Sequence, residues 1–206
     1  MRMILSQYHG NMNSKFKYIL FLFIIINSSF LSAQDVDRNV GLYGIFKFQN
    51  AIHHSVQQQR MLNFQLMRFY DSPNTMGSGG LSAEIGYFII PKKLSVGFVL
   101  GYTDYAYHGL ENWTNLLDLK YFLLEDRNSP FVYGQFGRVS GAINDNLKGT
   151  LLGFGVGQKL FFTKKLATVL SISYQLTRMS LSEEKFRYSD QYVRVKGIEF
   201  GIGLYF

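Results

Sequence analysis

Apolar residues alternate one by one with small or polar residues along the last nine positions of the chain, I-E-F-G-I-G-L-Y-F at residues 198–206. Alternation with a period of two indicates a β-strand with one apolar face. The pattern recurs at residues 94–105, 152–162 and 166–178, where Gly and Ser are frequent on the second face. A soluble sheet would show Lys, Glu and Thr to water there, and glycine is depleted from ordinary strands. An apolar face opposite a small one is typical of membrane β-barrels, in which the small face lines a narrow lumen.

The alternation predicts eight strands, at residues 40–49, 81–90, 94–105, 115–124, 131–140, 150–162, 166–178 and 192–206. Most of them are 10–13 residues long. This length suits the roughly 9–11 residues of a tilted membrane strand better than the roughly 5–6 of a soluble one. We therefore expect an all-β fold, an eight-stranded antiparallel up-and-down transmembrane β-barrel. A soluble lipocalin-like barrel, with its apolar faces turned inward, is the main alternative.

The connections between these strands alternate in length. Tight turns are expected at residues 91–93, 126–130 and 163–165, and longer connections at 50–80, 106–114, 141–149 and 179–191. Short periplasmic turns and long extracellular loops are the rule for outer-membrane barrels. The pattern therefore predicts that both ends of the barrel domain, including Phe206, are periplasmic.

One further segment, residues 60–70 (R-M-L-N-F-Q-L-M-R-F-Y), alternates well enough to be a strand. Counting it would give nine strands, an odd number that an antiparallel barrel of this type avoids. We interpret it as a β-hairpin arm of the first loop that projects above the membrane. A ten-stranded barrel would need one more strand, which the pattern does not show.

The first 33 residues have the order of a secretory signal peptide. Three basic residues and no acidic ones accompany an apolar run at residues 18–26, and small residues precede Ala33. We expect cleavage between Ala33 and Gln34, which divides the chain into a signal peptide, 1–33, and a barrel domain, 34–206. The alternative, a transmembrane anchor, would need roughly 20 apolar residues. Met12 is an alternative start, since the segment that follows it is already a normal signal peptide.

Composition narrows the possible functions. The net charge is +7, and without residues 1–33 it falls to +4, with 18 basic and 14 acidic residues. This mild, evenly spread charge does not suggest nucleic-acid binding. The chain has no cysteine, so disulfides and Cys-based metal sites are excluded.

The same alternation turns charged residues toward the lumen. They are Lys47, Glu84, Asp118, Lys120, Arg138, Lys159 and Glu199. The lumen of an eight-stranded barrel is just wide enough for side chains to fill, and buried charges must be paired. We therefore expect an ion-pair and hydrogen-bond network that plugs the barrel and leaves no open diffusion pore.

Aromatic residues make up 17% of the chain, and many lie near the ends of predicted strands. We expect these to form the two interfacial belts of a membrane barrel. Ordinary cross-strand packing is the alternative for those that face inward. The candidates include Tyr43, Phe48, Tyr87, Phe88, Tyr121, Phe131, Tyr133, Phe162 and Tyr205.

The ending G-I-E-F-G-I-G-L-Y-F and the stretch G-F-G-V-G-Q-K-L-F-F at residues 153–162, with eight long strands, resemble the small outer-membrane β-barrel domain family, the OmpA/OmpX-like group. The resemblance covers the whole of residues 34–206 and is specific for architecture rather than activity. It implies an integral protein of a Gram-negative-type outer membrane. It also implies that Phe200, Ile202, Leu204 and Phe206 form the signal recognised by the barrel assembly machinery.

Candidates for chemistry are few. His53 and His54 in the first loop and His108 in the second could meet at the outer rim, where Ser55, Asp104 or Glu111 would complete a hydrolase or metal site. Surface histidines without such a role are far more common, and we predict no catalytic residue, cofactor or metal. Arg68, Arg187, Arg194 and Lys196 near the rim are candidates to bind lipopolysaccharide phosphates, although a general contribution to solubility explains them equally well.

Three functions are consistent with this sequence. The favoured one is a structural or surface-interaction barrel, embedded in outer-membrane lipid and lipopolysaccharide, whose loops bind a surface or envelope partner. The second is an accessory subunit of an envelope secretion or transport assembly. The third and least favoured is an enzyme that modifies lipids of the outer leaflet.

Overall fold

A computed structural model describes residues 39–62, 65–71, 76–105, 110–125, 128–142, 147–163, 166–182 and 190–206. The chain divides into two compact units, Met1–Gln34 and Asp35–Phe206, and all described residues belong to the second. The predicted signal peptide and its Ala33–Gln34 cleavage site lie outside the described residues. Within the described part, no helix is long and apolar enough to span a membrane.

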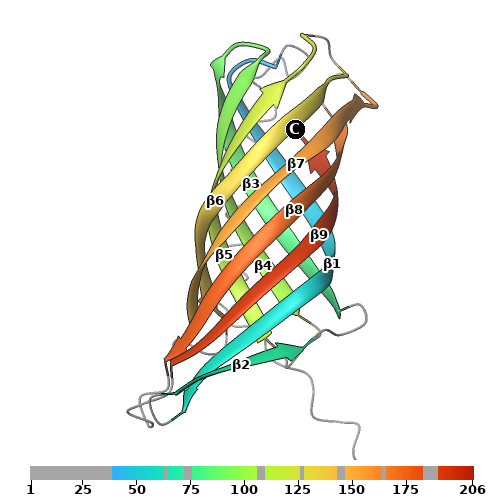
Figure 1. The fold of residues 1–206 in the computed structure, drawn as a ribbon. Helices are drawn as coiled ribbons and strands as arrows, with labels where there is room; N and C mark the ends of the chain where they lie inside the picture. Colours follow the sequence, from blue (N-terminus) through green and yellow to red (C-terminus); the bar gives the residue numbers. More distant parts are fainter. Residues whose placement is uncertain are drawn as a thin grey trace, which may run out of the picture. The chain divides into compact units, whose positions relative to one another are not determined.

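The described residues form nine strands in one antiparallel sheet. They are β1 (Leu42–Leu62), β2 (Gln65–Asp71), β3 (Met76–Ile90), β4 (Leu94–Tyr105), β5 (Leu110–Phe122), β6 (Pro130–Gly141), β7 (Leu147–Phe161), β8 (Ala167–Ser182) and β9 (Asp190–Tyr205). Neighbours pair in the order β1, β3, β4 and so on to β9, and β9 pairs with β1 to close the ring (Figure 1). The predicted eight-stranded antiparallel barrel is therefore confirmed, with β2 outside the ring.

The ninth strand explains the ambiguous segment at residues 60–70. Up to His53, β1 pairs with β3, and from Val56 to Leu62 it pairs with β2 instead. On its other side β1 keeps its pairing with β9 as far as Arg60. The predicted hairpin arm is confirmed, because the extended β1 and β2 form a hairpin beyond the end of the β1–β3 pairing (Figure 1).

Several strands are longer than the sequence pattern predicts, mainly at the end of the barrel opposite the chain terminus, which we call the loop end. There β3 begins at Met76 and β5 at Leu110, and β8 continues to Ser182. The extension of β3 is mostly Gly and Ser, and those of β5 and β8 mix apolar with polar residues, but their backbones continue to pair with the neighbouring strands. At the opposite end, which we call the turn end, β3 stops at Ile90 and β4 starts at Leu94, as predicted.

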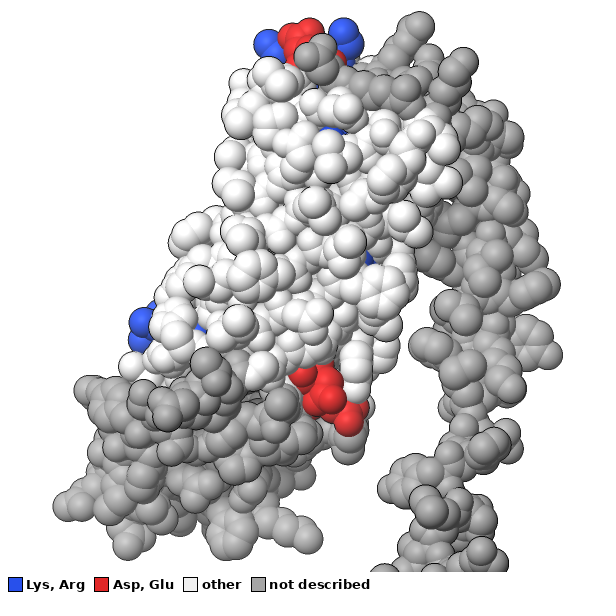
Figure 2. All heavy atoms as spheres, turned by 90° about the vertical axis from the view of Figure 1, so that its right-hand side faces the viewer, with Lys and Arg blue, Asp and Glu red and all other residues white. Residues whose placement is uncertain are grey.

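Every strand of the barrel turns large apolar residues outward, although others fill the lumen. Leu117, Phe136 and Ile202 expose 60%, 60% and 56% of their surface, while their sequence neighbours face the lumen. A soluble lipocalin-like barrel would have the opposite arrangement, so that alternative is rejected. Figure 2 shows the resulting band of uncharged side chains, with charged side chains gathered at its two ends. Such a band is the surface that a membrane barrel presents to lipid.

The terminal residue closes the seam between β9 and β1. The Gly44 nitrogen donates a hydrogen bond to the Phe206 carbonyl at 2.7 Å, and the Phe206 nitrogen donates one to the Gly44 carbonyl at 3.0 Å. The Phe206 ring lies against Gly44, where a side-chain carbon would overlap it. A glycine at position 44 therefore lets the terminal aromatic lie flat on the outer wall.

We expect Gly44→Val to destabilise the barrel, because the new side chain displaces the Phe206 ring at a cost of about 1–3 kcal/mol. The measurement is the temperature at which the purified protein loses its faster migration on an unboiled gel. Gly134→Val is the matched control: it adds the same side chain to the exposed face of β6, where the nearest atom would be a backbone oxygen at 4.0 Å. Equal transition temperatures for the two variants would contradict the role assigned to Gly44.

Candidate functional site in the barrel lumen

The lumen contains three layers along the barrel axis. At the turn end lies an aromatic floor, formed by Tyr43, Ile45, Phe88, Phe122, Phe131, Tyr133, Ala167, Val169 and Tyr205. At the loop end lies an upper apolar cluster, formed by Val56, Val99, Tyr105, Leu116, Val139, Leu147, Leu151, Met179 and Val195. Along β1, β3, β5 and β9 the inward residues between these clusters are charged, polar or small, so a polar layer separates two apolar ones.

Ring-to-ring packing forms the aromatic floor. The Tyr43 and Tyr205 rings stack with centroids 5.1 Å apart, and the Phe122 ring lies 5.2 Å from that of Phe88. The Lys159 ammonium lies 4.7 Å from the centroid of the Tyr205 ring and also faces Phe122 and Phe161. Ring faces attract a cation in this position, so the floor holds the charge of Lys159 as well as apolar surface.

These rings correct part of the predicted aromatic belts. Phe48, Tyr87, Tyr121 and Phe162 do lie on the outer wall, where each exposes 45% or more of its surface. Five other candidates are instead buried in the lumen, because their position in the strand alternation turns them inward. They are Tyr43, Phe88, Phe131, Tyr133 and Tyr205.

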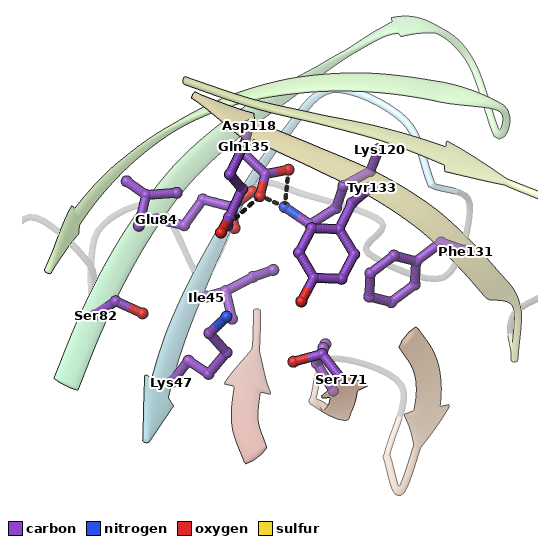
Figure 3. Close-up of a pocket in the computed structure, with 12 residues that line it drawn as sticks. Ile45, Lys47, Ser82, Glu84, Asp118, Lys120, Phe131, Tyr133, Gln135 and Ser171 are labelled. Carbon is purple, nitrogen blue, oxygen red and sulfur yellow. Dashed lines mark hydrogen bonds and ion pairs between the residues drawn. The ribbon is translucent and has the colours of Figure 1, made fainter. Parts of the chain in front are cut away.

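Lys120 is the centre of the polar layer. Its ammonium forms ion pairs with Glu84 and with Asp118, the latter at 2.7 Å (Figure 3). The Tyr43 hydroxyl donates to Glu84 Oε1 at 2.8 Å, and the Gln135 amide donates to Asp118 Oδ2 at 2.5 Å. Each buried carboxylate therefore has both a cation and a neutral donor, which is the arrangement that offsets its loss of hydration.

A second ion pair lies in the same layer. Lys47 Nζ is 3.5 Å from Glu199 Oε1. Two amide side chains complete the shell of this carboxylate, with Gln49 donating to Oε1 at 3.2 Å and Gln175 donating to Oε2 at 2.6 Å. The residues around Glu199 come from β1, β8 and β9, and those around Lys120 come from β1, β3, β5 and β6. The two centres together therefore connect most of the barrel wall.

The structure buries six of the seven residues predicted to face the lumen: Lys47, Glu84, Asp118, Lys120, Lys159 and Glu199. Five of them belong to the two ion-pair centres, and Lys159 lies in the floor. The prediction for Arg138 is wrong, because Arg138 is exposed on the outer wall. The β5–β6 register pairs Asp118 with Gln135 and Asn115 with Arg138, so Gln135 shares the inward face and Arg138 the outward one.

Sequence reasoning missed the neutral members of this layer. Tyr43, Gln49, Gln135 and Gln175 donate to the buried carboxylates, yet none of them carries a charge that would mark it. For Gln49 the alternation of faces along the strand was a usable signal, because Gln49 lies two residues after Lys47 on the same face of β1. For Gln135 no such signal existed, because both faces of β6 carry aromatic residues.

Glycines on the inner face provide the space for these long side chains. A side-chain carbon at Gly97 would overlap the Glu84 carboxylate, one at Gly86 the Tyr43 ring, and one at Gly201 the Lys47 stem. The space left between the floor and the ion pairs is a cavity of about 10 Å³, enough for about one water molecule. The Gly-rich inner face therefore belongs to a filled lumen.

The two adjacent histidines do not lie together as the candidate rim site would require. His53 is buried, with Nε2 2.8 Å from Ser78 Oγ and its ring stacked on Tyr105 at 5.2 Å. His54 points outward and stacks on Tyr174 at 5.7 Å. Both belong to β1, and successive residues of a strand face opposite sides. His108 lies outside the described residues, among which no three metal-binding side chains cluster.

We expect loss of both carboxylates around Lys120 to destabilise the barrel by about 3–5 kcal/mol, because a buried ammonium is left without an anionic partner. The test compares urea unfolding of Glu84→Gln/Asp118→Asn with that of the wild type. Adding Lys120→Met to this pair should restore most of the stability, since the unpaired charge is then gone. Glu125→Gln is the control: its exposed pairs with Lys92 and Lys93 should contribute less than about 1 kcal/mol.

Comparisons with known proteins agree at the level of the fold. No protein-family model and no curated protein matches the chain. Among solved structures, the outer membrane protein OprG from Pseudomonas aeruginosa superposes with a TM-score of 0.55 and 11% identity, over 84% of this chain and 98% of that one. The outer membrane protein AlkL, solved by solid-state NMR in DMPC lipid bilayers, gives a TM-score of 0.53 and 17% identity, over 84% and 93% of the two chains. Together with the apolar outer wall, these likenesses show that the chain has the fold of the small eight-stranded outer-membrane β-barrels.

Proposed function

We propose that this protein is an integral outer-membrane barrel with a plugged lumen, which acts as a structural or surface-interaction component through its loop end rather than as a pore. The observation that carries the proposal is the filled lumen: two apolar clusters enclose a layer of paired charges. An open channel would need a continuous aqueous path, and the described residues leave a cavity for about one water between floor and ion pairs.

The plug is built into the barrel wall. Every buried carboxylate in the polar layer is bonded to side chains from other strands, so opening the lumen would break ion pairs in a low-dielectric interior. Leaving one partner of such a pair unpaired is strongly unfavourable. A stable plug favours a role on the outside of the barrel, where the loops are.

The proposed orientation places the turn end and the C-terminus in the periplasm and the loop end outside the cell. The tight turns and Phe206 lie at one end of the barrel, as in outer-membrane barrels with short periplasmic turns. The outward residues Phe200, Ile202, Leu204 and Phe206 would then form the segment that the barrel assembly machinery recognises. The β1–β2 arm would be the most extended strand element at the outer surface.

We expect no steady ion conductance when the purified full-length protein is inserted into planar lipid bilayers, because the described lumen side chains pack as two apolar clusters around paired charges. A sixteen-stranded porin in the same membrane serves as the conducting control, since barrels of that size enclose an open channel. Stable single-channel steps from the protein, at voltages where the empty membrane is silent, would refute the plugged lumen.

The arm can be tested separately from the barrel for a contribution to the integrity of the membrane. Replacing residues 58–69 by Asn-Gly joins Gln57 to Tyr70, which are directly paired, through a two-residue hairpin turn. We expect this variant to keep its heat-modifiable migration and the resistance of the cells to detergent, while deletion of the whole protein lowers that resistance. Detergent sensitivity as severe as that of the full deletion would show that the arm itself supports the membrane.

A further inference from the structure

Five basic side chains gather on one side of the outer wall, near the loop end. Arg138 on β6, Thr150 on β7, Arg178 on β8 and Arg194 on β9 are consecutive cross-strand partners. Lys148 lies two residues from Thr150, and Lys196 two residues from Arg194, on the same outward faces. We call Arg138, Lys148, Arg178, Arg194 and Lys196 the basic patch. Only tertiary pairing brings them together, because they come from four strands that span almost 60 residues of sequence.

The described side chains around the patch carry more positive than negative charge. Among the described side chains, the outward acidic residues near the loop end are Asp104 and Glu111, which face each other across β4 and β5, and Glu111 accepts a 2.5 Å hydrogen bond from Tyr102. The ion pairs of the described residues involve Lys47, Lys92, Lys93 and Lys120 and no member of the patch. Among the described side chains of the outer wall near the loop end, the cations lie on β6–β9 and the two acids on β4 and β5, whereas charges spread for solubility would surround the barrel.

The patch borders the apolar band directly. One rung closer to the turn end, the outward row reads Phe136, Leu152, Leu176 and Lys196 across β6–β9, and Ile198 follows on β9. A groove of about 360 Å³ opens beside the patch, lined by Lys148, Thr150, Arg178, Ser180 and Arg194 among others. Cations and hydroxyls therefore lie just above a surface that is suited to acyl chains.

We propose that the basic patch binds the phosphate groups of a phosphorylated glycolipid of the outer leaflet, while the acyl chains of that lipid lie along the apolar band below. Guanidinium groups match phosphate oxygens with two parallel hydrogen bonds, and lysines add point charge. The proposal rests on the orientation given above, with the loop end outward. It assigns lipid recognition to the barrel wall. Arg68 and Arg187 are not included, because their side chains lie outside the described residues.

The test measures binding of radiolabelled bisphosphorylated lipid A to the folded full-length protein in detergent, for the wild type and for Arg178→Gln/Arg194→Gln. We expect the variant to bind about tenfold more weakly or worse, because two charge-assisted contacts are lost. Lys92→Gln/Lys93→Gln removes the same charge at the turn end and should bind as the wild type does. Heat-modifiable migration of each variant confirms that it is folded.

Three results would overturn the proposal. Lipid A without its phosphates could bind the wild type equally well, which would leave only acyl contacts. Millimolar inorganic phosphate could displace the lipid completely, which would indicate a simple anion site. Phosphatidylglycerol could bind as tightly as lipid A, which would remove the preference for a glycolipid. The planar-bilayer measurement tests the plugged lumen independently of lipid binding. Arg178→Gln/Arg194→Gln changes no lumen residue, so this variant should remain non-conducting.

Discussion

The pairing of β9 with β1 is the constraint on which the rest of this structure depends. Lipid provides no hydrogen-bond partner for an open sheet edge, so a membrane sheet has to close on itself. Closure at eight strands leaves a lumen that side chains can fill but that cannot hold a wide channel. The terminal Phe206, bonded to Gly44 through both backbone groups, sits at this closure and covers its outer side.

A narrow closed lumen explains the composition of the inner face. Each long inward side chain needs a small one beside it, which is why Gly97 lies next to Glu84 and Gly201 next to Lys47. Each buried charge also needs a partner, and these are supplied from across the barrel as ion pairs and amide donors. The inner face of this protein is therefore rich in glycine, serine and paired charges for one physical reason: the lumen is narrow and excludes water.

The lumen and the outer wall differ in how their charged side chains are arranged. Inside, three carboxylates are matched by lysines within the described residues, and the ammonium of Lys159 lies among aromatic rings. Outside, near the loop end, the described cations and acids lie on different strands of the wall. Ion pairing inside stabilises the barrel, whereas the cations of the basic patch outside create a surface field that an anionic headgroup can recognise. This contrast favours a function on the wall and loops rather than in the lumen.

The sequence by itself determined which residues share a face of each strand, because the side-chain period of a strand is two wherever it lies. The number of strands in the barrel and the outward direction of Ile202 and Leu204 followed from that period, whereas the extensions of β3, β5 and β8 at the loop end did not. Tertiary structure decided which strands lie next to one another and in what register. Arg138 was misassigned for this reason, since only its pairing opposite Asn115 shows that it faces outward. In the same way, Gln135 joins Asp118, and the basic patch forms from four strands, only through contacts between residues that are distant in the sequence.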